Sequence, residues 1–114
     1  MPAVFNVIQR ISGSPQQAEV KIELLWDTTT QDIVYSTAED VTFEGDLEFG
    51  VDEDGRWEKT LTPNDSISPA DNIYRVTETV AADDSSITYF ITVPDEAGPI
   101  FVGSILAAQP DWVA

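Results

Sequence analysis

The sequence contains no cysteine and no histidine among its 114 residues. Without cysteine there is neither a disulfide framework nor a thiolate metal site, so the fold must rest on packing and on hydrogen bonds. The missing histidine excludes Ser-His-Asp and Cys-His triads, the usual zinc sites and most general bases tuned near neutral pH. Carboxylates remain, but among 21 acidic residues a pair at glycosidase spacing arises by chance. We therefore expect no enzyme activity, no catalytic residue, no cofactor and no metal site.

Basic residues are also scarce. Five Lys and Arg stand against 21 Asp and Glu, which leaves a formal net charge of −16. Such a chain repels phosphate, so we expect it to bind neither nucleic acid nor an anionic membrane surface. The charge favours solubility, and it also matches proteins that work in high salt, as in a halophilic host.

Long apolar runs are absent as well. No stretch approaches the roughly 18 residues that a membrane-spanning helix needs. The N-terminus, Met1-Pro2-Ala3-Val4, lacks the basic and apolar regions of a secretory signal. The sequence therefore predicts a protein made in a cytoplasm.

What the sequence does contain is a series of short β-type runs separated by turn residues. In residues 18–26, Val20, Ile22 and Leu24 share one face and charged residues take the other, which is the alternation of a half-buried strand. Further strands are expected at 4–11, 33–35, 41–43, 47–51, 56–61, 72–80, 86–93 and 99–106.

The connections between these runs carry turn signals. Residues 44–46 are expected to turn a hairpin between 41–43 and 47–51, and Gly55 to supply a positive φ in the turn 52–55. Residues 62–71 read as an irregular crossover, and 106–109 could form a single helical turn. Together the runs predict an all-β fold, a single β-sandwich of about seven to nine mostly antiparallel strands without substantial helix. We expect this domain to cover residues 1–108, with residues 109–114 as a C-terminal tail.

Two acidic turns invite comparison with calcium sites. With Gly55 at position six of an EF-hand loop, positions one and twelve fall on Gly50 and Leu61, which cannot serve as side-chain ligands. A different calcium site at Asp83 and Asp84, or at the turn that begins with Asp52, is left open. A solvated turn is the preferred interpretation.

Aromatic residues offer a binding alternative, because sugar-binding modules often present flat rings on one sheet face. The candidates are Trp26, Trp57, Tyr35, Tyr74 and Tyr89. Trp26, Trp57 and Tyr89 lie on apolar stripes, where core packing is the more frequent explanation.

The tail is the most suggestive local feature. Pro110, Trp112 and Val113 place a large ring and two smaller apolar groups on a short segment after the last expected strand. Free termini fray unless they are tied down. Trp112 is therefore expected to pack either on its own domain or into a neighbouring subunit, and these three residues are the candidate assembly site.

From Val41 onward the chain carries a series of motifs in a fixed order: the turn 52–57 with its DEDGRW sequence, the YRVTE run at 74–78, the YFITVP run at 89–94 and the apolar segment 100–106. This order resembles the small immunoglobulin-like or transthyretin-like β-sandwich domains of tailed-phage minor tail proteins. The motifs are turn and core residues, so the resemblance concerns fold more than activity. It implies a virion protein that works by shape, whose partners are other virion proteins.

The leading hypothesis is a non-enzymatic virion structural protein, a tail or tail-tip module of a tailed virus, forming a homo-oligomer or bound to a lattice. One alternative is a capsid decoration protein. Another is a carbohydrate-binding adhesin that recognises the host surface.

Overall fold

In the computed structural model, residues 1–29, 33–38 and 41–113 are described. They form an all-β fold of ten strands and two short 3-10 helices. The strands are β1 (Ala3–Val7), β2 (Ala18–Trp26), β3 (Tyr35–Ser36), β4 (Leu47–Gly50), β5 (Arg56–Thr60), β6 (Ile67–Ser68), β7 (Asn72–Val80), β8 (Ser86–Ile91), β9 (Ile100–Phe101) and β10 (Leu106–Ala107). The helices are η1 (Asn64–Ser66) and η2 (Val102–Ser104), and neither is long and apolar enough to span a membrane.

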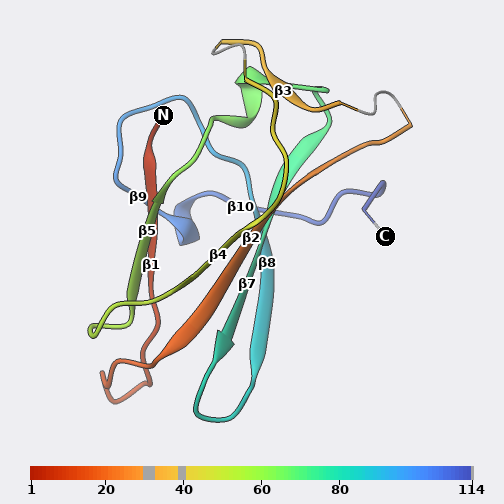
Figure 1. The fold of residues 1–114 in the computed structure, drawn as a ribbon. Helices are drawn as coiled ribbons and strands as arrows, with labels where there is room; N and C mark the ends of the chain where they lie inside the picture. Colours follow the sequence, from red (N-terminus) through yellow and green to blue (C-terminus); the bar gives the residue numbers. More distant parts are fainter. Residues whose placement is uncertain (30–32, 39–40, 114) are drawn as a thin grey trace.

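The strands form two main sheets and a small third one. The larger sheet has the order β10-β8-β7-β2-β4, and the smaller has the order β5-β1-β9. Strands β3 and β6 pair separately. All pairings are antiparallel except that of β1 with β9. Figure 1 shows the larger sheet crossing the molecule, with β1 and β5 on one side of it.

The core lies where the inner faces of the sheets meet. β2 and β7 pair along their whole length, and the alternating residues Val20, Ile22 and Val76 are buried. The remaining buried members of this core are Val4, Val34, Trp57, Leu61, Ile67, Tyr74, Ile91, Val93 and Val102. The alternation seen in the sequence therefore places one face of each long strand in a shared core, as in a sandwich.

A buried carboxylate joins the two main sheets. Glu78 on β7 is 4% exposed, and its Oε2 accepts hydrogen bonds from Asn6 Nδ2 at 2.7 Å, Trp57 Nε1 at 2.7 Å and Tyr89 Oη at 3.0 Å. Asn6 and Trp57 belong to the smaller sheet, whereas Tyr89 lies next to Glu78 in the larger one. The pKa of Tyr89 is raised far above its usual range, mainly because the side chain is buried and secondly because the Glu78 carboxylate is close. This cluster is a buried hydrogen-bond network that connects the two sheets across an otherwise apolar interior.

Three expected elements are corrected. Residues 41–43 and 47–51 do not form a hairpin with each other: β4 pairs with β2, while Thr42 bridges to Tyr35 and the Phe43 N–H donates to the Val34 carbonyl. Non-local pairing outweighs the local turn because it buries apolar side chains against β2.

The run 99–106 is not a single strand. It divides into β9 in the smaller sheet, η2, and β10 in the larger sheet, so it crosses from one layer to the other. The possible helical turn at 106–109 is wrong in its first half, since Leu106 and Ala107 pair with β8. The division adds one strand and β6, inside the expected crossover 62–71, adds another, while 41–43 forms no strand, so the nine expected runs become ten strands.

Candidate docking groove at the C-terminus

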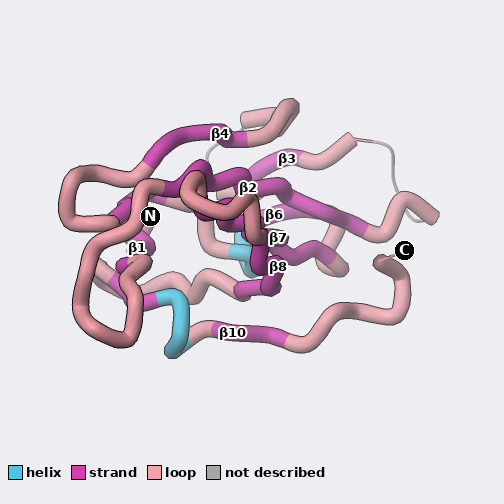
Figure 2. Tube along the Cα trace, turned by 90° about the horizontal axis from the view of Figure 1, so that it is seen from below, coloured by secondary structure: helices cyan, strands magenta, loops and turns pink. Residues whose placement is uncertain are grey.

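The tail returns to the larger sheet after β10. Figure 2 shows this segment leaving β10 and turning back toward the end of β2. Pro110, Trp112 and Val113 are all half-buried. Within the tail, the Val113 N–H donates to the Pro110 carbonyl at 3.1 Å, and Gln109 Nε2 donates to the Val113 carbonyl at 3.1 Å. The tail is thus a folded turn that lies against its own domain.

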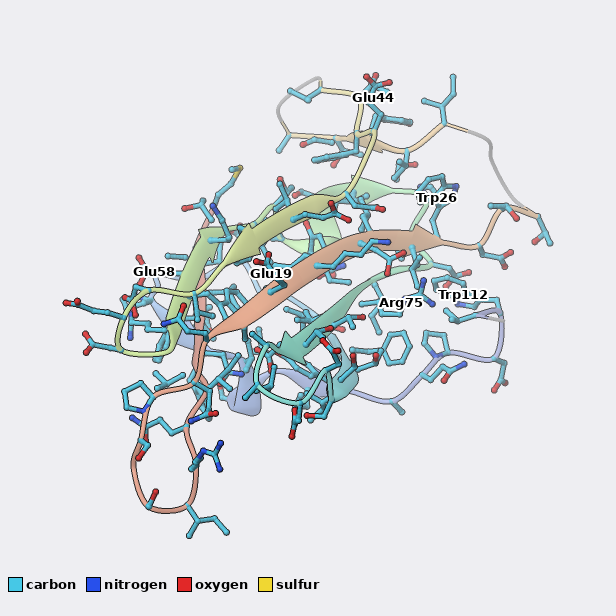
Figure 3. The ribbon with its side chains drawn as sticks, turned by 60° about the horizontal axis from the view of Figure 1, so that its bottom comes forward. Glu19, Trp26, Glu44, Glu58, Arg75 and Trp112 are labelled. Atoms are coloured by element: carbon cyan, nitrogen blue, oxygen red, sulfur yellow. The ribbon has the colours of Figure 1, made fainter. Side chains whose placement is uncertain are left out.

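Trp112 and Val113 line an open groove with residues of β2, of β7 and of the turn after β2. The groove has a volume of about 410 Å³, and its other lining residues are Leu25, Trp26, Thr28 and Arg75. In Figure 3, Trp26 lies above the end of β2 and Arg75 and Trp112 lie below it, all at the same side of the molecule. Of the three expected assembly residues, the structure brings Trp112 and Val113 to this groove, and Pro110 lies at the start of the turn that positions them.

Arg75, which lines the groove, forms an ion pair with Glu23. The Arg75 guanidinium donates to both oxygens of Glu23, from Nε at 3.0 Å and from an Nη at 2.9 Å. The two residues face each other across β2 and β7. This hydrogen bonding holds the pKa of the Glu23 carboxyl below its usual value and raises the pKa of Arg75. A bidentate pair of this kind fixes the orientation of the guanidinium plane beside the groove.

The indole N–H of Trp26 is buried and has no hydrogen-bond partner, which is true of no other buried side-chain N or O atom in the described residues. An unsatisfied buried donor costs roughly 1–3 kcal/mol.

The expected aromatic candidates are mostly core residues. Trp57 and Tyr74 are 2% and 5% exposed, Tyr89 donates to Glu78, and Trp26 packs at the margin of the core. Tyr35 is 39% exposed and belongs to the small β3–β6 pair. These five rings therefore do not form an exposed strip, and the core interpretation of Trp57 is confirmed.

In the two acidic turns, aspartate carboxylates accept hydrogen bonds from groups of the same turn. Asp52 Oδ1 accepts the N–H groups of Asp54 and Arg56 at 2.9 and 3.0 Å. The Asp83 carboxylate accepts the hydroxyl and N–H of Ser85, and these bonds lower its pKa. The described residues contain no cluster of three or more His, Cys, Asp or Glu side chains that could hold a metal ion.

Sequence reasoning did not single out Glu78, Arg75 or Leu25. Glu78 follows Tyr74 and Val76 at a spacing of two, so its position on the inward face of a strand could have been read from the same alternation. The groove itself has no such signal, because it joins the end of β2 to a tail more than 80 residues away.

A comparison with protein-family models found none that matches this chain, and a comparison with curated proteins found no significant match.

Proposed function

We propose that this chain is a non-enzymatic structural protein of a tailed virus, a tail or tail-tip module, and that it docks on a neighbouring virion subunit through the C-terminal groove. The observation that carries the docking part is the placement of Trp112 and Val113 beside Trp26 and Arg75 in one open groove. The virion setting rests on the resemblance of the motifs in residues 41–106 to minor tail domains.

The composition of the groove suits protein docking. Energetically dominant interface residues are enriched in Trp and Arg, and they lie in pockets that become dry on binding. Here two half-buried indoles and one oriented guanidinium share a groove of about 410 Å³.

A capsid decoration protein would use the same groove, and it would differ by its position and copy number on the particle. A carbohydrate-binding adhesin is the second candidate function. The observation that favours it is again local: Trp26 and Trp112 line the groove beside the Arg75–Glu23 pair, and sites for small ligands combine apolar rings with a few convergent polar groups.

The experiment that tests the proposal is immunogold labelling of whole particles from a producing lysate, with antibody raised against this chain. Gold at the tail or its tip supports the proposal. Gold over the head supports decoration instead, and particles without gold contradict both virion roles and direct attention to the adhesin, which a glycan array then tests.

The groove is tested separately with Trp112→Ser. We expect this variant to fold and to lose its incorporation into particles. The matched control is Phe101→Ser, which removes an aromatic ring that is 49% exposed and lies outside the groove. Normal incorporation of Trp112→Ser would contradict docking through the groove.

A further inference from the structure

In the part of the chain that the structure describes, four of the six residues of β8 have no strand beside them on one side of the larger sheet. β10 pairs only with Phe90 and Ile91 of β8, so no strand of the described chain lies beside Ser86, Ile87, Thr88 and Tyr89 on that side. Figure 1 shows the hairpin of β7 and β8 projecting from the body of the protein. An edge of this kind presents backbone donors and acceptors that can pair with another strand.

The register shows which backbone groups point outward. The Val80 N–H donates to the Ser85 carbonyl at 2.8 Å. Because hydrogen-bonded positions alternate along an antiparallel strand, the backbone N–H and C=O groups of residues 85, 87 and 89 point toward β7. The backbone groups of Ser86 and Thr88, which lie between these positions, therefore point away from β7. The Thr92 N–H, in phase with Ser86 and Thr88, donates outward to the Ile105 carbonyl at 3.2 Å and supports this assignment.

The uncovered part of β8 contains no charged residue, no proline and no bulge. Charged residues, prolines and bulges commonly prevent sheet edges from pairing. Residues 85–93 contain no charged residue and no proline, although the whole chain is 23% charged. Ile87, near the centre of the uncovered part, is 57% exposed. The opposite edge strand, β4, carries Glu48, and the edge strand β5 carries Arg56, Glu58 and Lys59.

We propose that this edge pairs with the same edge of a second copy of the chain, antiparallel about a two-fold axis at Ile87. In that register Ser86 of each copy faces Thr88 of the other, and both are residues whose backbone groups point outward. Two hydrogen-bonded pairs form, and the two Ile87 side chains meet at the axis. The two larger sheets then become one continuous sheet.

A second copy fits this edge because the edge is self-complementary, as a two-fold interface requires. Two copies that each carry a charge of −16 repel one another, so they should meet where the local charge is lowest. The uncharged segment 85–93 meets that condition. The same repulsion predicts that the dimer becomes tighter as salt rises, because screening shortens from about 30 Å at 10 mM to about 3 Å at 1 M. This inference does not depend on the proposed virion role.

Sedimentation velocity of the full chain tests the proposal, at about 10 mM and about 1 M NaCl and at protein concentrations up to about 1 mM. We expect a monomer–dimer equilibrium that shifts toward the dimer at high salt. Ile87→Lys places two like charges at the axis and should raise the dissociation constant at least about tenfold. Leu47→Lys is the matched control, since it makes the same charge change at a 43%-exposed apolar residue of the other edge strand, and it should leave the dissociation constant unchanged.

Hydrogen exchange locates the interface. The amides of Ser86 and Thr88 should exchange more slowly as the dimer forms, and the melting temperature of Ile87→Lys should stay near that of the wild type because the side chain is exposed. A monomer under all conditions would overturn the proposal, as would a dimer that Ile87→Lys leaves intact or that Leu47→Lys weakens equally.

Discussion

The indole N–H of Trp57 donates to the carboxylate of Glu78 at 2.7 Å, and this hydrogen bond links the two main sheets inside the protein. A carboxylate so far from water is stable only while its hydrogen bonds are made. Glu78 satisfies that condition with neutral donors from both layers. The packing of the sandwich and the position of this one acidic side chain therefore depend on each other.

Replacing Glu78 tests that dependence. Glu78→Leu leaves the buried Trp57 donor without its acceptor, and we expect it to lower the free energy of unfolding by about 3 kcal/mol or more. Glu78→Gln keeps an acceptor oxygen and should cost roughly 1–2 kcal/mol. Urea unfolding followed by tryptophan fluorescence measures both variants. Equal losses for Leu and Gln would show that the hydrogen bonds are not the source of the stabilisation.

Replacing Gly55 and Gly45 by alanine should destabilise the fold to different extents. Gly55 has φ +75°, and a Cβ added there would collide with the Ile8 carbonyl. Gly45 has φ +76° but no atom within 4 Å of an added Cβ. Gly45→Ala should therefore cost about 1 kcal/mol for the backbone conformation alone, and Gly55→Ala about 2–4 kcal/mol because the backbone must also move. Thermal or urea unfolding distinguishes them, and similar costs at both positions would contradict a role for the collision.

The Glu23–Arg75 pair predicts a dependence on pH. The pKa of Glu23 is lowered in the folded protein by its hydrogen bonds to Arg75. A carboxyl with a depressed folded-state pKa adds stability above its unfolded pKa and loses it as the pH falls through the folded value. Glu23→Gln should thus cost about 0.5–1 kcal/mol at pH 7, and the difference from wild type should shrink as the pH falls below the ordinary glutamate pKa toward pH 3.

The control for this pair is Glu19→Gln, which removes the same charge from an exposed position of the same strand. It should lower stability little at either pH, or raise it slightly by reducing self-repulsion. A Glu23→Gln penalty that persisted undiminished at pH 3 would contradict the ionic origin.

The net charge of −16 predicts a response to salt. Raising NaCl from about 10 mM to about 1 M should screen the repulsion among the carboxylates and raise the melting temperature. The comparison is made at low protein concentration, where the monomer prevails. A flat response would remove the argument for a protein adapted to high salt.

Much of the fold could be predicted from the sequence because alternation and turn residues are local signals. The residues of β2 and β7 were predicted with their observed limits, 18–26 and 72–80. Gly55 takes the positive φ that its turn was expected to require. The all-β class follows from the same periodicity.

The incorrect predictions concern short segments that could pair with more than one strand. Residues 41–43 and 47–51 are joined by a plausible turn, yet Phe43 bonds to Val34 and Phe49 pairs with Val20. The segment 99–106 has an apolar pattern compatible with one strand, but its residues leave one sheet and enter another. Local propensity sets the extended conformation, whereas burial against distant strands decides the pairing.

The sequence by itself determined the all-β class, the long central strands and the acidic composition, because composition and period-two alternation express these directly. Only the tertiary structure decided that Glu78 links the two main sheets, that Trp112 and Trp26 line the same groove, and that β10 covers only part of β8. Each of these depends on contacts between residues far apart in the chain, whose pairing is selected by the packing of the whole domain and not by any local pattern.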